Sequence, residues 1–212
     1  MPKNYLRLEL VIVFIIFPII LSIFRSRLKT LIIPILILFS IVCVIIFIKD
    51  PKISLKLVME RSNIRNNIGN VFLRFLLGSI ILIVGIYIFD KNNLFILPRR
   101  NISLWLQIII FYPFVSVYPQ EIIFRAFIYH RYKCFFNNST HFIIISSLLF
   151  GFVHIVYGNW LAPILSFLGG ILFAQTYLKS HSSILCSIEH GLWGILVFTI
   201  GIGQYFISDA IK

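Results

Sequence analysis

The sequence predicts an all-α membrane protein, a polytopic bundle of about seven transmembrane helices with six to eight as the range. Of its 212 residues, 59% are hydrophobic and 12% are charged, and the mean hydropathy is +0.99. A soluble domain averages roughly 45 to 50% apolar and about 25% charged residues. Apolar stretches close to the ~20 residues that cross a bilayer recur along the chain. These observations indicate a membrane-embedded chain.

We expect a single membrane domain over residues 1–212, with N-terminal spans in 1–100 and a second half over 101–206. No internal repeat or linker divides it. The expected spans are 8–24, 31–48, 71–89, 102–129, 142–157, 160–178 and 184–206. Glycines 169 and 170 in the sixth span favour close helix packing.

Two stretches are less regular. Within 49–70, basic residues alternate with apolar ones at helical spacing, which fits an amphipathic helix in the membrane interface or an ordinary cytoplasmic loop. The fourth span is too long for one straight crossing and contains Pro113 and Pro119. Because proline suits a first helical turn but breaks a helix interior, Pro119 can begin a new segment. Glu121 would then lie in a first turn, where the helix dipole favours a carboxylate.

The net charge of +12 does not indicate a nucleic-acid partner. Most Lys and Arg residues lie between the apolar spans instead of forming a basic stripe, so they are expected to face anionic headgroups. Their distribution gives a weak preference for a cytoplasmic N-terminus. The cysteines, Cys43, Cys134 and Cys186, have no paired spacing and predict neither a disulfide framework nor a zinc motif.

Polar residues with acid–base chemistry occur in three of the apolar segments. Glu121 and Arg125 stand four residues apart and share a helix face, with the carboxylate in the favourable N-terminal position. His154 and His190 lie in two later segments. An ionisable group at membrane depth costs about 2.5 to 3.5 kcal/mol, so it indicates a functional site. We expect these side chains to converge, with a buried structural ion pair as the alternative for Glu121 and Arg125.

The order of these motifs resembles the CPBP intramembrane proteases. That family includes the CAAX-processing Ras-converting enzyme and the bacterial bacteriocin-processing or self-immunity (Abi) proteins. Gln-Glu-x-x-x-Arg at 120–125, Phe-x-x-x-His at 150–154 and a third apolar segment with His190 carry the resemblance, which covers about residues 101–205. It implies a helical membrane protein that cleaves peptides near the membrane. Glu121, Arg125, His154 and His190 fall on its motif positions.

Two positions depart from the family pattern. The family has two consecutive glutamates, of which the first is usually taken as the water-activating base, and this chain has Gln120 there. A carboxamide cannot accept a proton near neutral pH. The third motif ends in Asn or Asp, and this chain has Gly194. Loss of an oxyanion donor there would cost on the order of 10²-fold in rate.

The expected activity is therefore an intramembrane endopeptidase in which glutamate and histidine activate water. Its substrate would be a peptide or protein at the membrane, of the CAAX type or a bacteriocin or leader peptide. One alternative is a catalytically impaired scaffold or regulator of the same fold, and another is a redox protein with His154 and His190 as axial ligands.

Glu121, His154 and His190 would make a zinc set with one open position, although a metal-independent route needs no zinc. The partners we expect are the substrate and the lipid bilayer. We expect a multi-pass protein of a bacterial cytoplasmic membrane, with a eukaryotic endomembrane as the alternative. The sequence does not indicate an oligomeric state.

Overall fold

The computed structural model describes residues 2–50 and 63–206, and the regular elements in this part of the chain are all helical. The predicted all-α class is thereby confirmed. Six helical runs among the described residues are long and apolar enough to cross a membrane: Lys3–Ile23, Arg25–Lys49, Ile64–Phe89, Ile102–Arg131, Ser139–Tyr157 and Leu161–Ser180. A shorter apolar helix of 17 residues, α13 (Ser183–Thr199), follows them. The expected seventh span, 184–206, therefore ends as a helix at Thr199.

The runs are assembled from shorter elements that follow one another closely. The helices that precede α13 are α1 (Lys3–Val11), α2 (Phe17–Ile23), α3 (Arg25–Leu28), α4 (Ile32–Lys49), α6 (Ile64–Phe89), α7 (Ile96–Arg100), α8 (Ile102–Tyr112), α9 (Tyr118–Glu121), α10 (Ile128–Arg131), α11 (Ser139–Val153) and α12 (Leu161–Ser180). π turns occupy Ile12–Ile16, Pro113–Val117 and Ile122–Phe127, and the 3-10 turn His154–Tyr157 follows α11.

Asparagine side chains cap the start of two of the helices that carry the site. The side chain of Asn101 accepts a hydrogen bond from the backbone N–H of Leu104 at the start of α8, at 2.9 Å. Asn138 does the same for His141 at the start of α11, also at 2.9 Å. Such N-caps satisfy backbone donors that the first turn leaves unpaired, so they fix where each helix begins.

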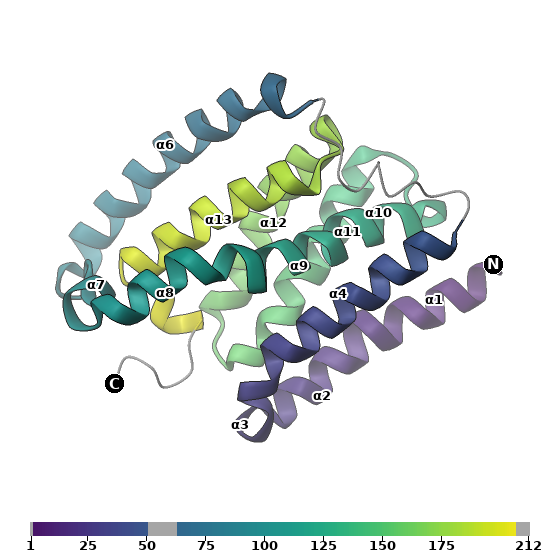
Figure 1. Ribbon diagram of the computed structural model, residues 1–212, viewed down its shortest axis with the longest axis horizontal. Helices are drawn as coiled ribbons and strands as arrows, with labels where there is room; N and C mark the ends of the chain where they lie inside the picture. The colour runs from purple at the N-terminus through teal and green to yellow at the C-terminus, as the bar shows by residue number, and fades with distance from the viewer. Residues whose placement is uncertain (1, 51–62, 207–212) are drawn as a thin grey trace.

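The run Ile102–Arg131 is the central element of the bundle. It packs against α13 on one side and α4 on the other, with α11 and α12 also in contact with its second π turn (Figure 1). The main hydrophobic cluster includes Ile122–Phe124 and Ala126–Ile128 of this run. The segment that contains Gln120, Glu121 and Arg125 is therefore surrounded by other helices.

The expected helix break at Pro119 is wrong, because the chain stays helical from Ile102 to Arg131. A π turn directly precedes the segment with Pro119. Such a turn bonds each N–H to a carbonyl one residue farther back, and local π adjustments can re-satisfy the backbone groups that a proline leaves free in a membrane helix. Glu121 consequently lies in the interior of a long run and not in a first turn. Its charge needs partners other than a helix dipole.

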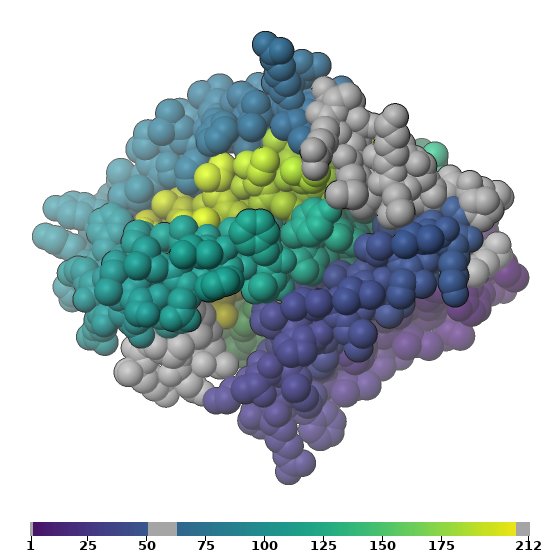
Figure 2. All heavy atoms as spheres, in the orientation of Figure 1, coloured from purple at the N-terminus to yellow at the C-terminus, as the bar shows by residue number. Residues whose placement is uncertain are grey.

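The outer surfaces of several helices are apolar, as expected for contact with lipid. Large hydrophobic side chains on α6 are strongly exposed, including Ile81 at 71% and Ile88 at 66%. Figure 2 shows α6, α13, the run through α8–α10 and α4 as adjoining bands on one face of the molecule. In water such an apolar surface would favour aggregation, whereas lipid tails cover it at no comparable cost.

The amphipathic segment predicted over 49–70 falls mostly on residues 51–62, which lie outside the described part of the chain. The helix α6 begins at Ile64 and not at residue 71 as expected. Polar residues at 64–70 thus extend the third span, because a helix can continue past the hydrocarbon core without exposing backbone groups to lipid.

Close packing of α11 against α12 depends on small residues. A Cβ atom at Gly170 would lie 3.1 Å from Ser147 Cα, so the predicted packing role of this glycine is confirmed. At Gly169 the near atoms belong to Phe173 of the same helix, so this glycine does not serve that contact. At Gly151 of α11, a Cβ would lie 2.8 Å from the Pro163 carbonyl oxygen of α12. Backbone atoms leave little room to adjust there.

Gly151→Ala is expected to lower the free energy of unfolding by about 1 to 3 kcal/mol, because the added methyl group pushes α11 and α12 apart. Gly85→Ala is the matched control, since a Cβ at Gly85 meets no atom within 4 Å. Thermal unfolding in detergent, followed by tryptophan fluorescence, compares the two. A Gly151→Ala protein that melts no lower than Gly85→Ala would show that this contact does not limit stability.

Candidate active site

Glu121 is fully buried between the central run and α13. Its Oε1 lies 2.8 Å from Nδ1 of His190, and its Oε2 lies 3.2 Å from Nε of Arg125. The second contact is close enough for an ion pair, although the N–H is not aligned for a hydrogen bond. The predicted convergence of Glu121, Arg125 and His190 is thus present. The carboxylate has a partner on its own run and another on α13.

Arg125 is also fully buried and reaches a third element of the bundle. Its Nη1 donates to the Ser146 hydroxyl of α11 at 2.7 Å, and its guanidinium lies 4.9 Å from the centre of the Phe150 ring. A guanidinium over an aromatic face is favourable, more so where water is excluded. Arg125 therefore neutralises Glu121 and ties the central run to α11.

His190 is held by two aromatic rings and two polar side chains. Its ring stacks on Phe173 with centroids 4.6 Å apart and meets Phe150 edge-on at 5.4 Å. Its Nδ1 faces the Glu121 carboxylate and its Nε2 lies 3.3 Å from the Tyr112 hydroxyl. Since a carboxylate only accepts hydrogen bonds, Nδ1 is assigned the proton. Glu121 thereby fixes both the orientation and the tautomer of His190.

His154 follows α11 in the turn His154–Tyr157 and is 7% exposed. Its Nδ1 lies 2.6 Å from the carbonyl oxygen of Phe150, which accepts a hydrogen bond and cannot donate one. The proton is therefore assigned to Nδ1, which leaves a lone pair on Nε2. Both site histidines contact the ring of Phe150.

A cavity of about 490 Å³ brings the two histidines together. Its polar or potentially reactive lining includes Tyr112, Ser116, Gln120, His154 and His190, and most of the remaining lining is apolar. This volume is within the range of roughly 300 to 1,000 Å³ that is typical of ligand sites. Glu121 does not line this cavity. The carboxylate lies behind His190, whereas Gln120 faces the open space.

A smaller cavity of about 90 Å³ lies toward α2 and α4, and most of its lining is apolar. It shares Ser116, Gln120 and His154 with the larger one. The Gln120 amide donates to the Ser116 hydroxyl at 2.8 Å. The two cavities therefore meet at this polar pair and at His154.

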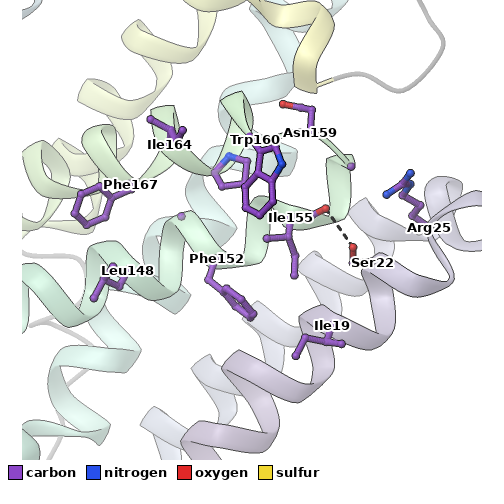
Figure 3. A pocket seen from close by; sticks show the side chains of 13 residues that line it. Ile19, Ser22, Arg25, Leu148, Phe152, Ile155, Asn159, Trp160, Ile164 and Phe167 are labelled. Carbon is purple, nitrogen blue, oxygen red and sulfur yellow. Dashed lines mark hydrogen bonds between the residues drawn. The ribbon is translucent and has the colours of Figure 1, made fainter.

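A larger groove of about 740 Å³ runs along the outside of α2, α11 and α12. Among the residues that line it, Arg25 is the single ionisable side chain, and it lies at one end near Ser22 (Figure 3). None of the described residues that line this groove is a general base. The groove is therefore not a candidate for the chemistry that the sequence predicts.

The side chains that could hold a metal ion are described by their grouping and their hydrogen bonds. In the ranges 2–50 and 63–206, no three His, Cys, Asp or Glu residues are grouped so that they could hold a metal ion. Nδ1 of each site histidine is engaged in a hydrogen bond, and both Glu121 oxygens face a cationic or N–H partner. The expected zinc set of Glu121, His154 and His190 does not form a ligand group in this conformation. Zinc binding remains a prediction.

Sequence reasoning missed Tyr112 and Ser116. A signal was present, because Tyr112, Ser116 and Gln120 are spaced four apart and so share one helix face. All three line the cavity of about 490 Å³ that contains the two histidines. Ser146 was also missed, and its role as the Arg125 partner depends on helix packing that sequence spacing does not reveal.

The fold and the site together define a class: a multi-pass, all-helical integral membrane protein with a buried glutamate–histidine site beside an internal cavity. Residues 101–196 match the family described as type II CAAX prenyl endopeptidase Rce1-like. This match agrees with the resemblance to CPBP intramembrane proteases and covers the central run and the polar site residues from Tyr112 to His190. At the level of the family, it supports an intramembrane CAAX-type endopeptidase. No curated protein and no solved structure matches the chain.

Arg125→Met is expected to lower the free energy of unfolding by about 3 to 5 kcal/mol, because it leaves the buried Glu121 carboxylate without its cation. Arg131→Met is the matched control. Arg131 also pairs with a carboxylate, that of Glu9 at 2.7 Å, but the two side chains are 11% and 17% exposed. Water can therefore compensate part of that loss. Thermal unfolding in detergent compares the free energy of unfolding of the two variants with that of the wild type.

The double variant Glu121→Gln/Arg125→Met should recover part of the lost stability, because it removes the uncompensated charge. If Arg125→Met is no less stable than Arg131→Met, the buried pair is not the constraint that its position indicates.

Proposed function

We propose that this protein is an intramembrane endopeptidase that hydrolyses a peptide bond of a membrane-proximal substrate. The observation that carries the proposal is His154, whose Nε2 is left with a lone pair beside a cavity that also contains His190. In the described part of the chain, Nε2 of His154 has no hydrogen-bond partner. It is therefore free to accept a proton from a bound water.

His154 takes the role of general base in this proposal. A histidine is suited to proton transfer near neutral pH, and such catalysis contributes about 10²- to 10⁴-fold in rate. The hydrogen bond from Nδ1 to the Phe150 carbonyl keeps the ring in the required tautomer. Gln120 cannot take this role, since its carboxamide accepts no proton, but it can help to hold the water.

Glu121 acts through His190 as a positioning residue, because its carboxylate does not face the cavity. This differs from the expectation that Glu121 itself activates the water. His190 Nε2 lies beside the Tyr112 hydroxyl, and both residues line the cavity together with His154. These two packed polar side chains are suited to a place where charge develops during hydrolysis.

The reaction is a hydrolysis with no co-reactant besides water. The water oxygen bonds to the peptide carbonyl carbon while one water proton moves to His154 Nε2 and the carbonyl electron pair moves to oxygen. The tetrahedral intermediate then reforms the carbonyl and breaks the C–N bond. His154 returns its proton to the leaving amine. No step is assigned to a metal ion.

The substrate is a peptide or protein segment that enters from the membrane. Two classes follow from the family match and the resemblance: a lipidated CAAX-type C-terminus and a bacteriocin or leader peptide. The location we propose is a bacterial cytoplasmic membrane, and the resemblance to the bacterial members of the family supports it.

A non-catalytic scaffold or regulator is the second candidate, and Gln120 is the observation that favours it. Gln120 faces both cavities at the position where the family has its water-activating glutamate. Under this alternative, the histidines would be dispensable and the helix surfaces would carry the function.

His154→Ala is expected to lower kcat by about 10²- to 10⁴-fold, because it removes the base that accepts the water proton. The assay uses detergent-purified protein with a panel of leader peptides and lipidated C-terminal peptides. His141→Ala is the control, since His141 is exposed near the start of α11 and lines neither cavity.

Cleavage by the wild type that survives His154→Ala would contradict the assignment of the base. A folded wild type that cleaves no peptide, together with a Gln120→Glu variant that does, would show an impaired protease and favour the scaffold.

A further inference from the structure

Tyr112 is the last residue of α8, and its side chain reaches across to α13. Its ring meets Phe198 edge-on with centroids 5.3 Å apart, which fixes the ring beside the cavity. The hydroxyl lies 3.3 Å from His190 Nε2. The chain of contacts Glu121, His190, Tyr112 therefore ends in a hydroxyl at the cavity wall.

Gly194 makes the position of this hydroxyl possible. A Cβ atom at Gly194 would lie 2.5 Å from both Cε1 and the hydroxyl oxygen of Tyr112. No side chain can be added there unless the tyrosine moves. Glycine inside a helix costs roughly 0.5 to 1 kcal/mol relative to alanine, and α13 carries it where a Cβ atom would overlap the tyrosine. Both residues line the cavity.

We propose that the Tyr112 hydroxyl is the oxyanion donor of this site, in the place that a side chain at position 194 would otherwise fill. The inference rests on the proposed peptidase function. It also accounts for Gly194, which stands where the family pattern has Asn or Asp and therefore lacks the oxyanion donor expected at that position. The polar group at this place belongs to α8, and glycine at 194 leaves the space for it.

The donor acts at the step in which charge appears on the substrate oxygen. As the water oxygen bonds to the carbonyl carbon and its proton moves to His154, the carbonyl oxygen becomes an oxyanion. The Tyr112 O–H rotates from His190 Nε2 toward this oxyanion and donates a hydrogen bond to it. No proton leaves the tyrosine, and the bond is released when the carbonyl reforms. Because the packed ring already holds the hydroxyl oxygen in place, only the O–H bond has to rotate, which costs little reorganisation.

Tyr112→Phe tests the proposal directly, because phenylalanine keeps the ring against Phe198 and Gly194 and removes only the hydroxyl. We expect kcat to fall by about 10²- to 10³-fold, the usual effect of losing one oxyanion donor. KM and the melting temperature should change little. Tyr87→Phe is the control, since Tyr87 is 54% exposed on α6 and does not line the cavity.

Moving the polar side chain from position 112 to position 194 separates hydrogen-bond donation from packing. Tyr112→Ala should lose activity, and Tyr112→Ala/Gly194→Asn should recover part of it, because the carboxamide of residue 194 can enter the vacated space. Gly194→Ala alone should lower kcat, although it removes no polar group.

The outcomes distinguish the two proposals. If the wild type cleaves peptides, His154→Ala is inactive and Tyr112→Phe keeps full kcat, only the role of Tyr112 is overturned. If the folded wild type cleaves no peptide in the panel, the peptidase function and the oxyanion donor are overturned together.

Discussion

The arrangement of the bundle depends on one buried carboxylate. Glu121 is shielded from water and lies in the interior of a helix, so neither solvent nor a helix terminus stabilises its charge. Arg125 and His190 stabilise the carboxylate instead, and each of them connects it to another helix. Arg125 contacts Ser146 of α11, and His190 brings α13 against the central run. These contacts offset the free-energy cost of burying the Glu121 charge in the membrane, and they also place His190 at the cavity.

The amino-acid sequence allows much of the fold and part of the site to be predicted. Apolar stretches of bilayer length place the spans, because in lipid only a helix satisfies its own backbone. A lone glutamate in such a stretch indicates a site, and Arg125 follows from its spacing of four residues. His190 can be associated with Glu121 because both are costly at membrane depth. The contact itself, 2.8 Å between side chains 69 residues apart, required the folded structure.

Other features do not follow from local pattern. Pro119 suits a helix start, yet the chain remains helical through it, with π turns on both sides of α9. The different surroundings of Gln120 and Glu121 also depend on rotation about the helix axis. Adjacent residues face about 100° apart, so one faces the cavity and the other faces His190. Tyr112 and Gly194 belong to different helices, and only their packing relates them.

The most direct test concerns the state of His190, since the account requires Glu121 to act through it. Nitrogen-15 NMR of protein labelled at histidine, with His190 assigned by substitution, reports which ring nitrogen carries the proton. We expect Nδ1 of His190 to be protonated in the wild type, and the signal to change in Glu121→Leu. A neutral His190 protonated only at Nε2 would contradict the account. The proton between the two side chains would then belong to Glu121, which would donate a hydrogen bond to Nδ1. Glu121 would not be the carboxylate that orients His190.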